Sequence, residues 1–375
     1  MPLTPPPDSP AETSPVWPFP PVTEPKQRLT AVILGYGYMG SIRRQVLEQD
    51  GGYDITGIVD PVRGEHPYPR PAGIAQALAL KPDAVFCCLP NHLNSHAIIA
   101  ALDAGCHVFA EMPPARTMAE MQRILLAEGR SDQRKVQFGF NHRQHQSVQH
   151  AKQIITTEQL GRVRSIHGVY GQAPAPSTKD WRGQLRTGGG VLLDHGIHLL
   201  DLALYLAPGL RVVTSRTDAT QARPLETEAW IGLADERGVC AEVRSSAHLR
   251  HPTFSLSLEM ERGALTLRGL NTRSGAYGKE TLIIDDGRAT RAIEFEGNPS
   301  WAREVTAFRE SVTQNNPVTM GTTGDAAGIL REIQTVYAHN RQYALGLVVE
   351  LDFADTARQF LPPRELAGVG SDLSP

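Results

Sequence analysis

The feature that most constrains the fold is a glycine-rich turn, GYGYMG at 35–40, between an apolar run and a helix-like stretch. The run LTAVIL at 29–34 is typical of a buried strand, and MGSIRRQVLEQ at 39–49 is typical of a helix. A G-x-G-x-x-G pattern in this position predicts a tight turn between a parallel strand and the helix that follows it. The folded part of the chain is therefore expected to begin as an α/β protein.

Within this turn each glycine has its own expected role. Gly35 permits the tight turn, Gly37 lets the backbone approach a pyrophosphate, and Gly40 allows close packing of helix on strand. Tyr38 and Met39, between the last two glycines, are expected to contact the cofactor as well. The helix N-terminus would face the anion. We interpret the motif as a dinucleotide site; a glycine turn without a ligand is the simpler alternative.

Asp60 strengthens this interpretation, because it ends a second strand-like run at 53–60 and follows Gly40 by 20 residues. Its carboxylate would accept hydrogen bonds from ribose hydroxyls and repel a 2′-phosphate, which favours NAD over NADP. Arg63, three residues later, would favour a phosphate instead. The expected cofactor is NAD or NADP, with NAD slightly favoured.

Two parts of the chain differ in their pattern. Up to about residue 140, strand-like runs at 82–90, 107–111 and 135–140 alternate with helix-like runs at 91–105 and 117–129. This alternation predicts a doubly wound parallel sheet.

Beyond residue 145 most runs are strand-like, and FSLSLEME at 254–261 alternates as in an antiparallel sheet with one packed face. Helices are expected near 145–157, 190–206, 300–314 and 323–340. We expect domains at 28–141 and 142–345, a Pro-rich tail at 1–27 and a C-terminal extension at 346–375.

Composition excludes several classes of function. The 375 residues suit two domains, and a net charge of −3 with mixed signs gives no basic surface for nucleic acid. No run of 18 apolar residues and no secretory leader are evident, so a cytoplasmic protein without membrane spans is expected. The cysteines lack metal-ligand spacing, so we expect reduced, buried thiols and no metal site; they are Cys87, Cys88, Cys106 and Cys240.

The second informative stretch is TGGGVLLDHGIHLLD at 187–201. Its three glycines allow close backbone approach before a helix. Asp194 and His198 are four residues apart, so an α-helix would place them on one face. A carboxylate one turn from an imidazole can orient the ring and adjust its pKa for proton transfer. An ordinary amphipathic helix with one polar pair is the alternative.

Five motifs in this order carry a resemblance to a known family: GYGYMG, CCLPNHLNSH, AGCHVFAEMP, GFNHR and GGGVLLDHGIHLLD. Together they resemble the Gfo/Idh/MocA family of NAD(P)-dependent oxidoreductases, over roughly 29–345. The resemblance implies a Rossmann domain followed by an α/β domain whose open, mainly antiparallel sheet forms a homodimer or homotetramer. It also implies hydride transfer to or from a secondary carbinol or ketone of a sugar, cyclitol or nucleotide-sugar. Asp194 and His198 would then face the nicotinamide and handle the hydroxyl proton.

The resemblance assigns further residues. Those expected near the cofactor are Asn91, His96 and Glu111, and those expected near the substrate are Met112, Asn141, Arg143, Lys179, Trp181 and Arg182. An ordinary packing role is an equal alternative for Trp181. The remaining histidines of these motifs are expected to be structural or exposed: His92, His142, His145 and His195.

One position departs from the family pattern, because Met112 stands where the family has a proton-handling lysine. Methionine neither donates a hydrogen bond nor titrates, and the loss of such a group costs about 10²–10⁴ in rate if nothing replaces it. His198 could act alone while Met112 packs against an apolar part of the substrate, or Lys179 or Arg182 could reach the position. A catalytically impaired sensor that binds NAD and a sugar, and an NAD-dependent glycosidase, are the alternative functions.

Overall fold

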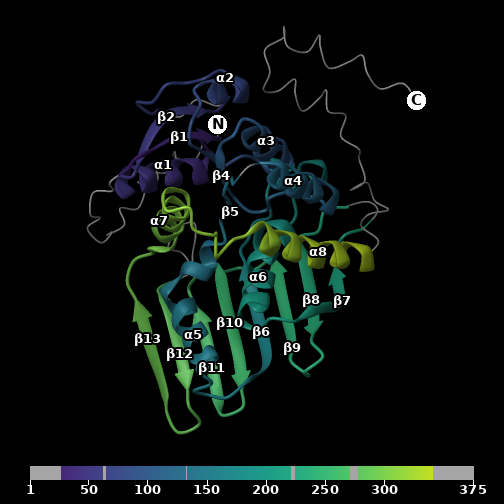
Figure 1. Ribbon diagram of the computed structural model, residues 1–375. Coiled ribbons are helices and arrows are strands. Elements are labelled where there is room, and N and C mark those ends of the chain that lie inside the picture. Colours follow the sequence, from purple (N-terminus) through teal and green to yellow (C-terminus); the bar gives the residue numbers. More distant parts are fainter. Residues whose placement is uncertain (1–26, 62–64, 132, 221–223, 271–277, 341–375) are drawn as a thin grey trace, which may run out of the picture.

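The computed structural model describes residues 27–61, 65–131, 133–220, 224–270 and 278–340. Nearly all of the expected N-terminal tail, the whole C-terminal extension and Arg63 lie outside these residues. Two sheets dominate the structure. Figure 1 shows the first sheet and its helices above the second sheet, with α7 and α8 near the junction.

The first sheet is parallel throughout, which confirms the doubly wound prediction. Its strand order is β2-β1-β3-β4-β5, so the chain reverses direction across the sheet between β1 and β3. The short helix α2 was not expected, because six residues give too little periodicity to recognise. The elements are β1 (Leu29–Leu34), α1 (Tyr38–Asp50), β2 (Tyr53–Val59), α2 (Ile74–Ala79), β3 (Ala84–Cys87), α3 (Asn91–Asp103), β4 (His107–Ala110), α4 (Met118–Arg130) and β5 (Val136–Phe138).

The strands of this sheet are apolar on both faces because each face is covered. Val32 and Leu34 of β1 join the hydrophobic core that includes α3 and α4. Ala31 and Ile33, which point the other way, join a second core with α1. A strand buried on both faces reads as a continuous apolar run, which is the pattern of LTAVIL.

The second sheet has the order β13-β12-β11-β10-β6-β9-β8-β7, and every pair is antiparallel except β6 with β9. This confirms the mainly antiparallel prediction. The elements are α5 (Gln146–Thr156), β6 (Val163–Gly171), α6 (Ile197–Leu206), β7 (Arg211–Thr217), β8 (Glu228–Ala234), β9 (Cys240–Ser246), β10 (Thr253–Met260), β11 (Gly263–Arg268), β12 (Glu280–Asp285) and β13 (Thr290–Phe295).

Alternation along β10 explains how this sheet packs. Phe254, Leu256 and Leu258 are buried, whereas Ser255 and Ser257 between them are only partly buried. Helices α5 and α6 contact strands of the sheet, α5 at β11–β13 and α6 at β6 and β9. One face of the sheet therefore forms a core, and the other face carries the polar positions.

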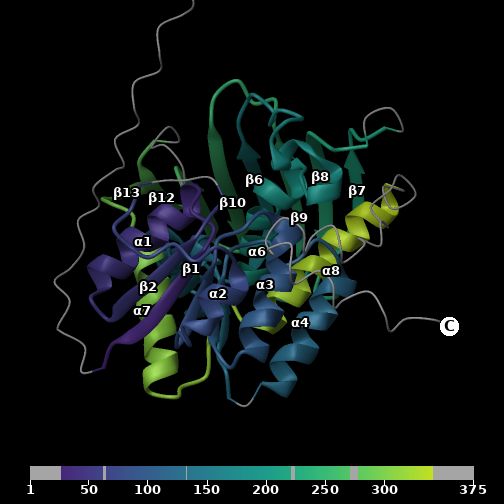
Figure 2. The ribbon, with the colours of Figure 1, turned by 90° about the horizontal axis from the view of Figure 1, so that it is seen from above.

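The last two helices, α7 (Ser300–Thr313) and α8 (Thr323–His339), return to the first sheet. Seen from above, α7 lies beside α1 and α8 lies beside α4 (Figure 2). Trp301, Val305 and Phe308 of α7 complete the core formed by α1, β1 and β3. We had expected this helix to belong to the second domain, at 142–345, but it covers one face of the first sheet. The face of the sheet on which α1 lies carries apolar side chains that the helices between β1 and β5 leave uncovered, and α7 buries them.

A buried ionic cluster fixes α7 on α1. The Arg43 guanidinium is fully buried; its Nε lies 2.5 Å from Glu111 Oε1 and an Nη lies 2.8 Å from Glu304 Oε2. Burial raises the pKa of Glu304 to about 8, and Glu111 adds to this, although Arg43 opposes it. One cation therefore serves two carboxylates, and Glu304 keeps a proton at neutral pH.

The cluster predicts a specific dependence of stability on pH. A carboxyl whose pKa rises on folding from 4.5 to about 8 stabilises the fold below about pH 4.5, and this contribution is lost as the pH rises through about 8. The glutamine of the Glu304→Gln variant cannot titrate. Between pH 5 and 8 the free energy of unfolding should therefore decrease less in the variant than in the native protein, and the two decreases should differ by on the order of 2 kcal/mol. Urea unfolding measured across this range checks the difference.

The matched control is Glu332→Gln on α8, another buried glutamate, which accepts a hydrogen bond from the Val212 backbone. Parallel stability curves for Glu304→Gln and the native protein would contradict the protonated state assigned to Glu304.

Candidate active site

A cavity of about 610 Å³ lies at the carboxyl edge of the first sheet. Residues that follow β1, β3, β4 and β5 line it, including Gly35, Cys88, Glu111 and Gly139. Across the cavity lie Trp181 and the segment 188–198. In doubly wound proteins ligands bind at this edge, where the strand order reverses, and the volume suits a cofactor or a small substrate.

The glycine turn provides an anion-binding end for α1. Gly35 has a φ of +90°, and a Cβ there would lie 2.4 Å from the Cys88 carbonyl oxygen. A Cβ at Gly40 would lie 2.1 Å from the Gly35 oxygen, so these two glycines hold turn, strand and helix together. In contrast, a Cβ at Gly37 would meet no atom within 4 Å. Gly37 is also the N-cap of α1 and provides no side-chain cap, so no side chain of the cap residue competes with a ligand at this helix end.

Asp60 lies beside this turn and lines the cavity. Its Oδ2 accepts a hydrogen bond of 2.5 Å from the Tyr36 backbone N–H. The glycine turn, an uncapped helix end and a carboxylate at the end of β2 are the chemical groups that a dinucleotide requires. The residues present therefore fit an NAD-type cofactor.

The three glycines before α6 bring the covering loop close to the sheet. A Cβ at Gly189 would lie 2.3 Å from the Arg182 oxygen, and one at Gly190 would lie 2.2 Å from Glu226 Oε1. Gly188 accepts a hydrogen bond of 2.7 Å from the Asn91 side chain at the start of α3. Larger residues would push the loop away from the cavity, so the glycines are required by packing.

Asp194 and His198 both line the cavity, but the backbone between them is not a regular α-helix. Leu192–Gly196 forms a π-helical turn that leads into α6. Asp194 Oδ2 lies 3.5 Å from the Nδ1 of His195, and within the described residues no hydrogen bond joins Asp194 to His198. Burial lowers the pKa of His198 to about 4, although Asp194 partly opposes the shift. The imidazole of His198 is therefore uncharged at neutral pH. The sequence analysis had instead predicted a pKa close to neutrality.

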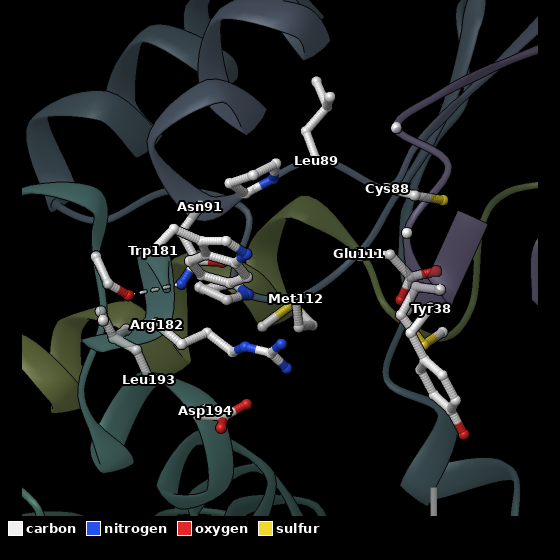
Figure 3. A pocket seen from close by; sticks show the side chains of 18 of the residues that line it. Tyr38, Cys88, Leu89, Asn91, Glu111, Met112, Trp181, Arg182, Leu193 and Asp194 are labelled. Atoms are coloured by element: carbon white, nitrogen blue, oxygen red, sulfur yellow. Dashed lines mark hydrogen bonds between the residues drawn. The ribbon is translucent and has the colours of Figure 1, made fainter. Parts of the chain in front are cut away.

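Met112 and Arg182 face the same space. Met112 packs against the main hydrophobic core and lines the cavity; its peptide bond to Pro113 is cis. Figure 3 shows the Arg182 side chain extending between Met112 and Asp194, with Trp181 beside it and Tyr38, Cys88 and Glu111 across the cavity. Arg182 also pairs with Asp180, Nε to Oδ1 at 3.3 Å and Nη to Oδ2 at 3.2 Å.

Most of the side chains assigned from the sequence converge here. Those lining the cavity are Gly35, Gly37, Tyr38, Met39, Asp60, Asn91, Glu111, Met112, Asn141, Trp181, Arg182, Asp194 and His198. Four assigned residues do not line it: Gly40, His96, Arg143 and Lys179. Gly40 packs within the turn, and Lys179 is exposed on the loop.

Arg143 and His96 have other surroundings. The Arg143 guanidinium is buried and pairs with Asp201 of α6, with distances down to 2.5 Å, and with Asp325 of α8 at 3.1 Å. His96 lies on α3, where burial and then Arg123 of α4 lower its pKa. Arg143 therefore joins α6 to α8.

Sequence reasoning missed several residues of the cavity. Tyr170 of β6, Trp301 of α7 and His195 line it, and the first two come from elements whose position only the fold determines. His195 had been expected to be structural or exposed, yet it lies beside Asp194. His142 and His145 are buried, as a structural role requires, and His92 is partly buried.

The cysteine prediction needs one correction. Cys240 is exposed rather than buried, because it begins β9 on the outward-facing side of the alternating pattern. Cys87 and Cys106 are buried, and Cys88 is partly buried at the cavity. Across the described ranges, no group of three or more His, Cys, Asp or Glu side chains is arranged to hold a metal ion. In the same ranges no helix is long and apolar enough to cross a membrane.

Comparison with known proteins agrees with this geometry. Residues 29–140 match a family model described as "Oxidoreductase family, NAD-binding Rossmann fold", and residues 148–266 match "GFO/IDH/MocA C-terminal domain". The chain is 30% identical over 266 residues to dTDP-3,4-didehydro-2,6-dideoxy-alpha-D-glucose 3-reductase from Streptomyces violaceoruber, covering 68% of this chain and 75% of that protein.

Two further relatives are informative. D-glucoside 3-dehydrogenase from Escherichia coli is 34% identical over 133 residues, but the match spans only 35% of this chain and 38% of that enzyme. A crystal structure of a 3-ketoreductase from Actinomadura kijaniata with NADP and TDP-benzene superposes with a TM-score of 0.75 at 20% identity, covering 84% of this chain and 98% of that one. The two family models and the Streptomyces relative together establish that the chain belongs to the Gfo/Idh/MocA family of oxidoreductases.

Proposed function

We propose that the protein is an NAD(P)-dependent oxidoreductase that transfers a hydride to or from a secondary carbinol or ketone of a sugar-like ring. The observation that carries the proposal is a single cavity lined both by the glycine turn at the uncapped end of α1 and by Asp194 and His198. A dinucleotide-binding end and a proton-handling end in one cavity are the two requirements of such a reaction.

Residues of the first sheet hold the cofactor in this proposal. The N–H groups at the start of α1 and the open space at Gly37 receive the pyrophosphate, and Asp60 accepts hydrogen bonds from the ribose. When bound, the nicotinamide ring supplies or accepts the hydride. The carboxylate of Asp60 disfavours a 2′-phosphate, so NAD is the preferred form.

His198 moves the proton. Its imidazole is neutral at neutral pH because burial lowers its pKa to about 4, so it can accept the hydroxyl proton as the substrate is oxidised. The resulting imidazolium is stabilised by the Asp194 carboxylate, which the His198 ring senses electrostatically. On reduction the same imidazolium returns the proton to the new alkoxide.

Arg182 takes over the hydrogen-bonding part of the role that Met112 cannot perform. Its guanidinium extends between Met112 and Asp194, so it can donate to the reacting oxygen and stabilise negative charge on it (Figure 3). A guanidinium does not give up its proton at physiological pH, so it cannot replace His198 as a base. Met112 and Trp181 offer apolar surface to a face of the sugar ring.

The relatives suggest where on the ring the reaction occurs. The Escherichia coli and Streptomyces violaceoruber enzymes are named for reactions at position 3 of a hexose. We extend this position to the present chain as part of the proposal. We also propose a homodimer or homotetramer formed through the polar face of the second sheet, where Trp230 is flanked by Arg216 and Arg244.

One other function is favoured by a specific observation. Met112 neither donates a hydrogen bond nor titrates, which would suit a sensor that binds NAD and a sugar without turnover. Asp194, His198 and Arg182 in one cavity favour the oxidoreductase, because binding alone does not require a buried neutral imidazole beside a carboxylate.

The first prediction of the proposed function concerns cofactor choice. The native protein should bind NADH at least tenfold more tightly than NADPH, and Asp60→Ala should narrow this ratio by about tenfold because the repulsion of the 2′-phosphate is lost. Fluorescence titration with both nucleotides measures the ratio. Asp54→Ala, an exposed carboxylate on β2, is the control and should leave it unchanged. A native preference for NADPH would refute this role of Asp60.

A second prediction tests the reaction itself. With NADH deuterated at the reactive carbon and a 3-keto glucoside, deuterium should appear at the ring carbon in one configuration. His198→Gln should lower turnover by about 10²–10⁴, whereas His251→Gln, an exposed histidine outside the cavity lining, should not. Binding of both ligands without deuterium transfer would identify the protein as the sensor.

The third prediction addresses the missing lysine. Arg182→Met should lower kcat by about 10²-fold, because no donor remains beside the reacting oxygen. Adding Met112→Lys to that variant should restore part of the loss. Lys179→Met is the control, because that side chain is exposed on the same loop but does not line the cavity. If Arg182→Met retains native kcat, His198 acts without help from the loop.

A further inference from the structure

The proposed reaction gives no role to His195, although this residue lines the cavity. It follows Asp194 directly in the π-helical turn, and it is only 9% exposed. From the sequence we had expected a structural or exposed histidine at this position. A polar ring buried this deeply in the wall of the cavity needs a physical reason.

Two neighbours fix the orientation of the His195 ring. The ring of Tyr170, which also lines the cavity, lies nearly perpendicular to it, with an angle of 85° and a centroid distance of 4.7 Å. Asp194 Oδ2 lies 3.5 Å from its Nδ1. The imidazole is therefore held between an aromatic ring and a carboxylate before any ligand binds, which lowers the entropy lost on binding.

The two ring nitrogens of His195 have different surroundings. Nδ1 is buried without a hydrogen-bond partner. Within the described residues Nε2 makes no hydrogen bond either, but protein atoms do not enclose it, and the ring lines the cavity. A neutral imidazole donates from one nitrogen and accepts at the other. The Asp194 carboxylate favours the proton on the nearer nitrogen, Nδ1, so Nε2 is an open acceptor at the cavity.

An apolar ring would fill the place of His195 more favourably if packing were its only role. A buried nitrogen without a partner is unfavourable, whereas a phenyl ring of similar shape carries no such penalty. A phenyl ring would also keep the perpendicular contact with Tyr170. Packing alone therefore does not explain the imidazole, whereas binding of a polar ligand group in the cavity does.

His195 lies close to the groups that act on the reacting carbon in the proposed function. Asp194 is its neighbour in the chain, and the ring of Tyr170 lies 6.3 Å from that of His198, centroid to centroid. His195 and His198 thus border the same part of the cavity. On a sugar ring held there, the polar group nearest to the reacting carbon is the hydroxyl on the next carbon.

We propose that His195 determines substrate specificity by accepting a hydrogen bond from a hydroxyl on a ring carbon adjacent to the reacting one. The inference rests on the proposed function, because it takes the occupant of the cavity to be a sugar-like ring. The ligand class is then a ring with two neighbouring free hydroxyls, of which one reacts beside His198 and the other binds at His195. A site that pairs with a hydroxyl rejects an analogue that lacks it, because the nitrogen then stays unpaired.

The test measures binding of methyl glucoside to the complex with NADH, in which the alcohol form of the sugar cannot be oxidised. His195→Phe should bind it about tenfold more weakly than the native protein, because one hydrogen bond is lost. His195→Gln, whose side-chain oxygen is again an acceptor, should recover part of the affinity. His107→Phe, at the end of β4 far from the cavity, is the control and should bind methyl glucoside like the native protein. Calorimetric titration measures each affinity.

Deoxy analogues identify the hydroxyl that pairs with His195. Either the 2-deoxy or the 4-deoxy analogue should bind the native protein about tenfold more weakly than methyl glucoside does, and that loss should be absent in His195→Phe. The 6-deoxy analogue is the control ligand and should lose the same affinity in both proteins. Equal affinity of His195→Phe and the native protein for methyl glucoside, or equal losses for both deoxy analogues in the two proteins, would overturn the proposal.

Failure of the proposed function has a different signature, because these affinities are measured without turnover. If deuterium transfer fails while the affinities follow the expected pattern, the protein is a sugar-binding sensor and the role of His195 stands. Normal deuterium transfer with equal affinities would instead retain the oxidoreductase and remove His195 from the binding site.

Discussion

The fully buried guanidinium of Arg43 is the interaction on which the rest of the structure depends. It lies on α1, one turn beyond the glycine motif, and it binds Glu111 after β4 and Glu304 of α7. Glu111 is the counter-charge of this buried cation, and Glu304 accepts a hydrogen bond from a guanidinium N–H that would otherwise be buried without a partner, so docking of α7 completes the surroundings of Arg43. Docking of α7 also brings Trp301 to the cavity. One buried hydrogen-bonded cluster thus couples the start of the dinucleotide fold to a helix more than 250 residues later.

The side chains that line the cavity are held in place by glycines, at which neighbouring segments of the backbone pack closely together. Gly35 and Gly40 bring α1 against β1 and β3. Gly189 lets the covering loop pack at Arg182 against the segment that leads into the Asp194–His198 helix, and Gly190 lets that segment pack against Glu226. The π-helical turn Leu192–Gly196 then sets the side chains of Asp194 and His195 at the cavity. π-Helical turns inside α-helices often occur at functional sites, because they alter which side chains face inward.

We propose that the site divides two tasks between two side chains, where the family resemblance led us to expect one lysine at position 112. In our proposal Arg182 holds the reacting oxygen and His198 moves the proton. The separation has a physical basis, since a guanidinium is a permanent donor and a buried imidazole is a neutral acceptor at physiological pH. In the same proposal Met112 supplies apolar surface at the position where a lysine was expected.

Local patterns in the sequence determined the fold class. A buried parallel strand appears as a continuous apolar run, the antiparallel strand FSLSLEME alternates between apolar and polar residues, and a glycine motif marks the turn from strand to helix. Most of the site residues that they identified line the cavity, among them Asp60, Asp194 and His198. Tertiary structure alone decided what lies next to Met112, since Arg182 reaches it from a loop 70 residues later. It also placed His142 behind His198 and α7 on the first sheet, because burial and long-range packing leave no periodic signal in the chain.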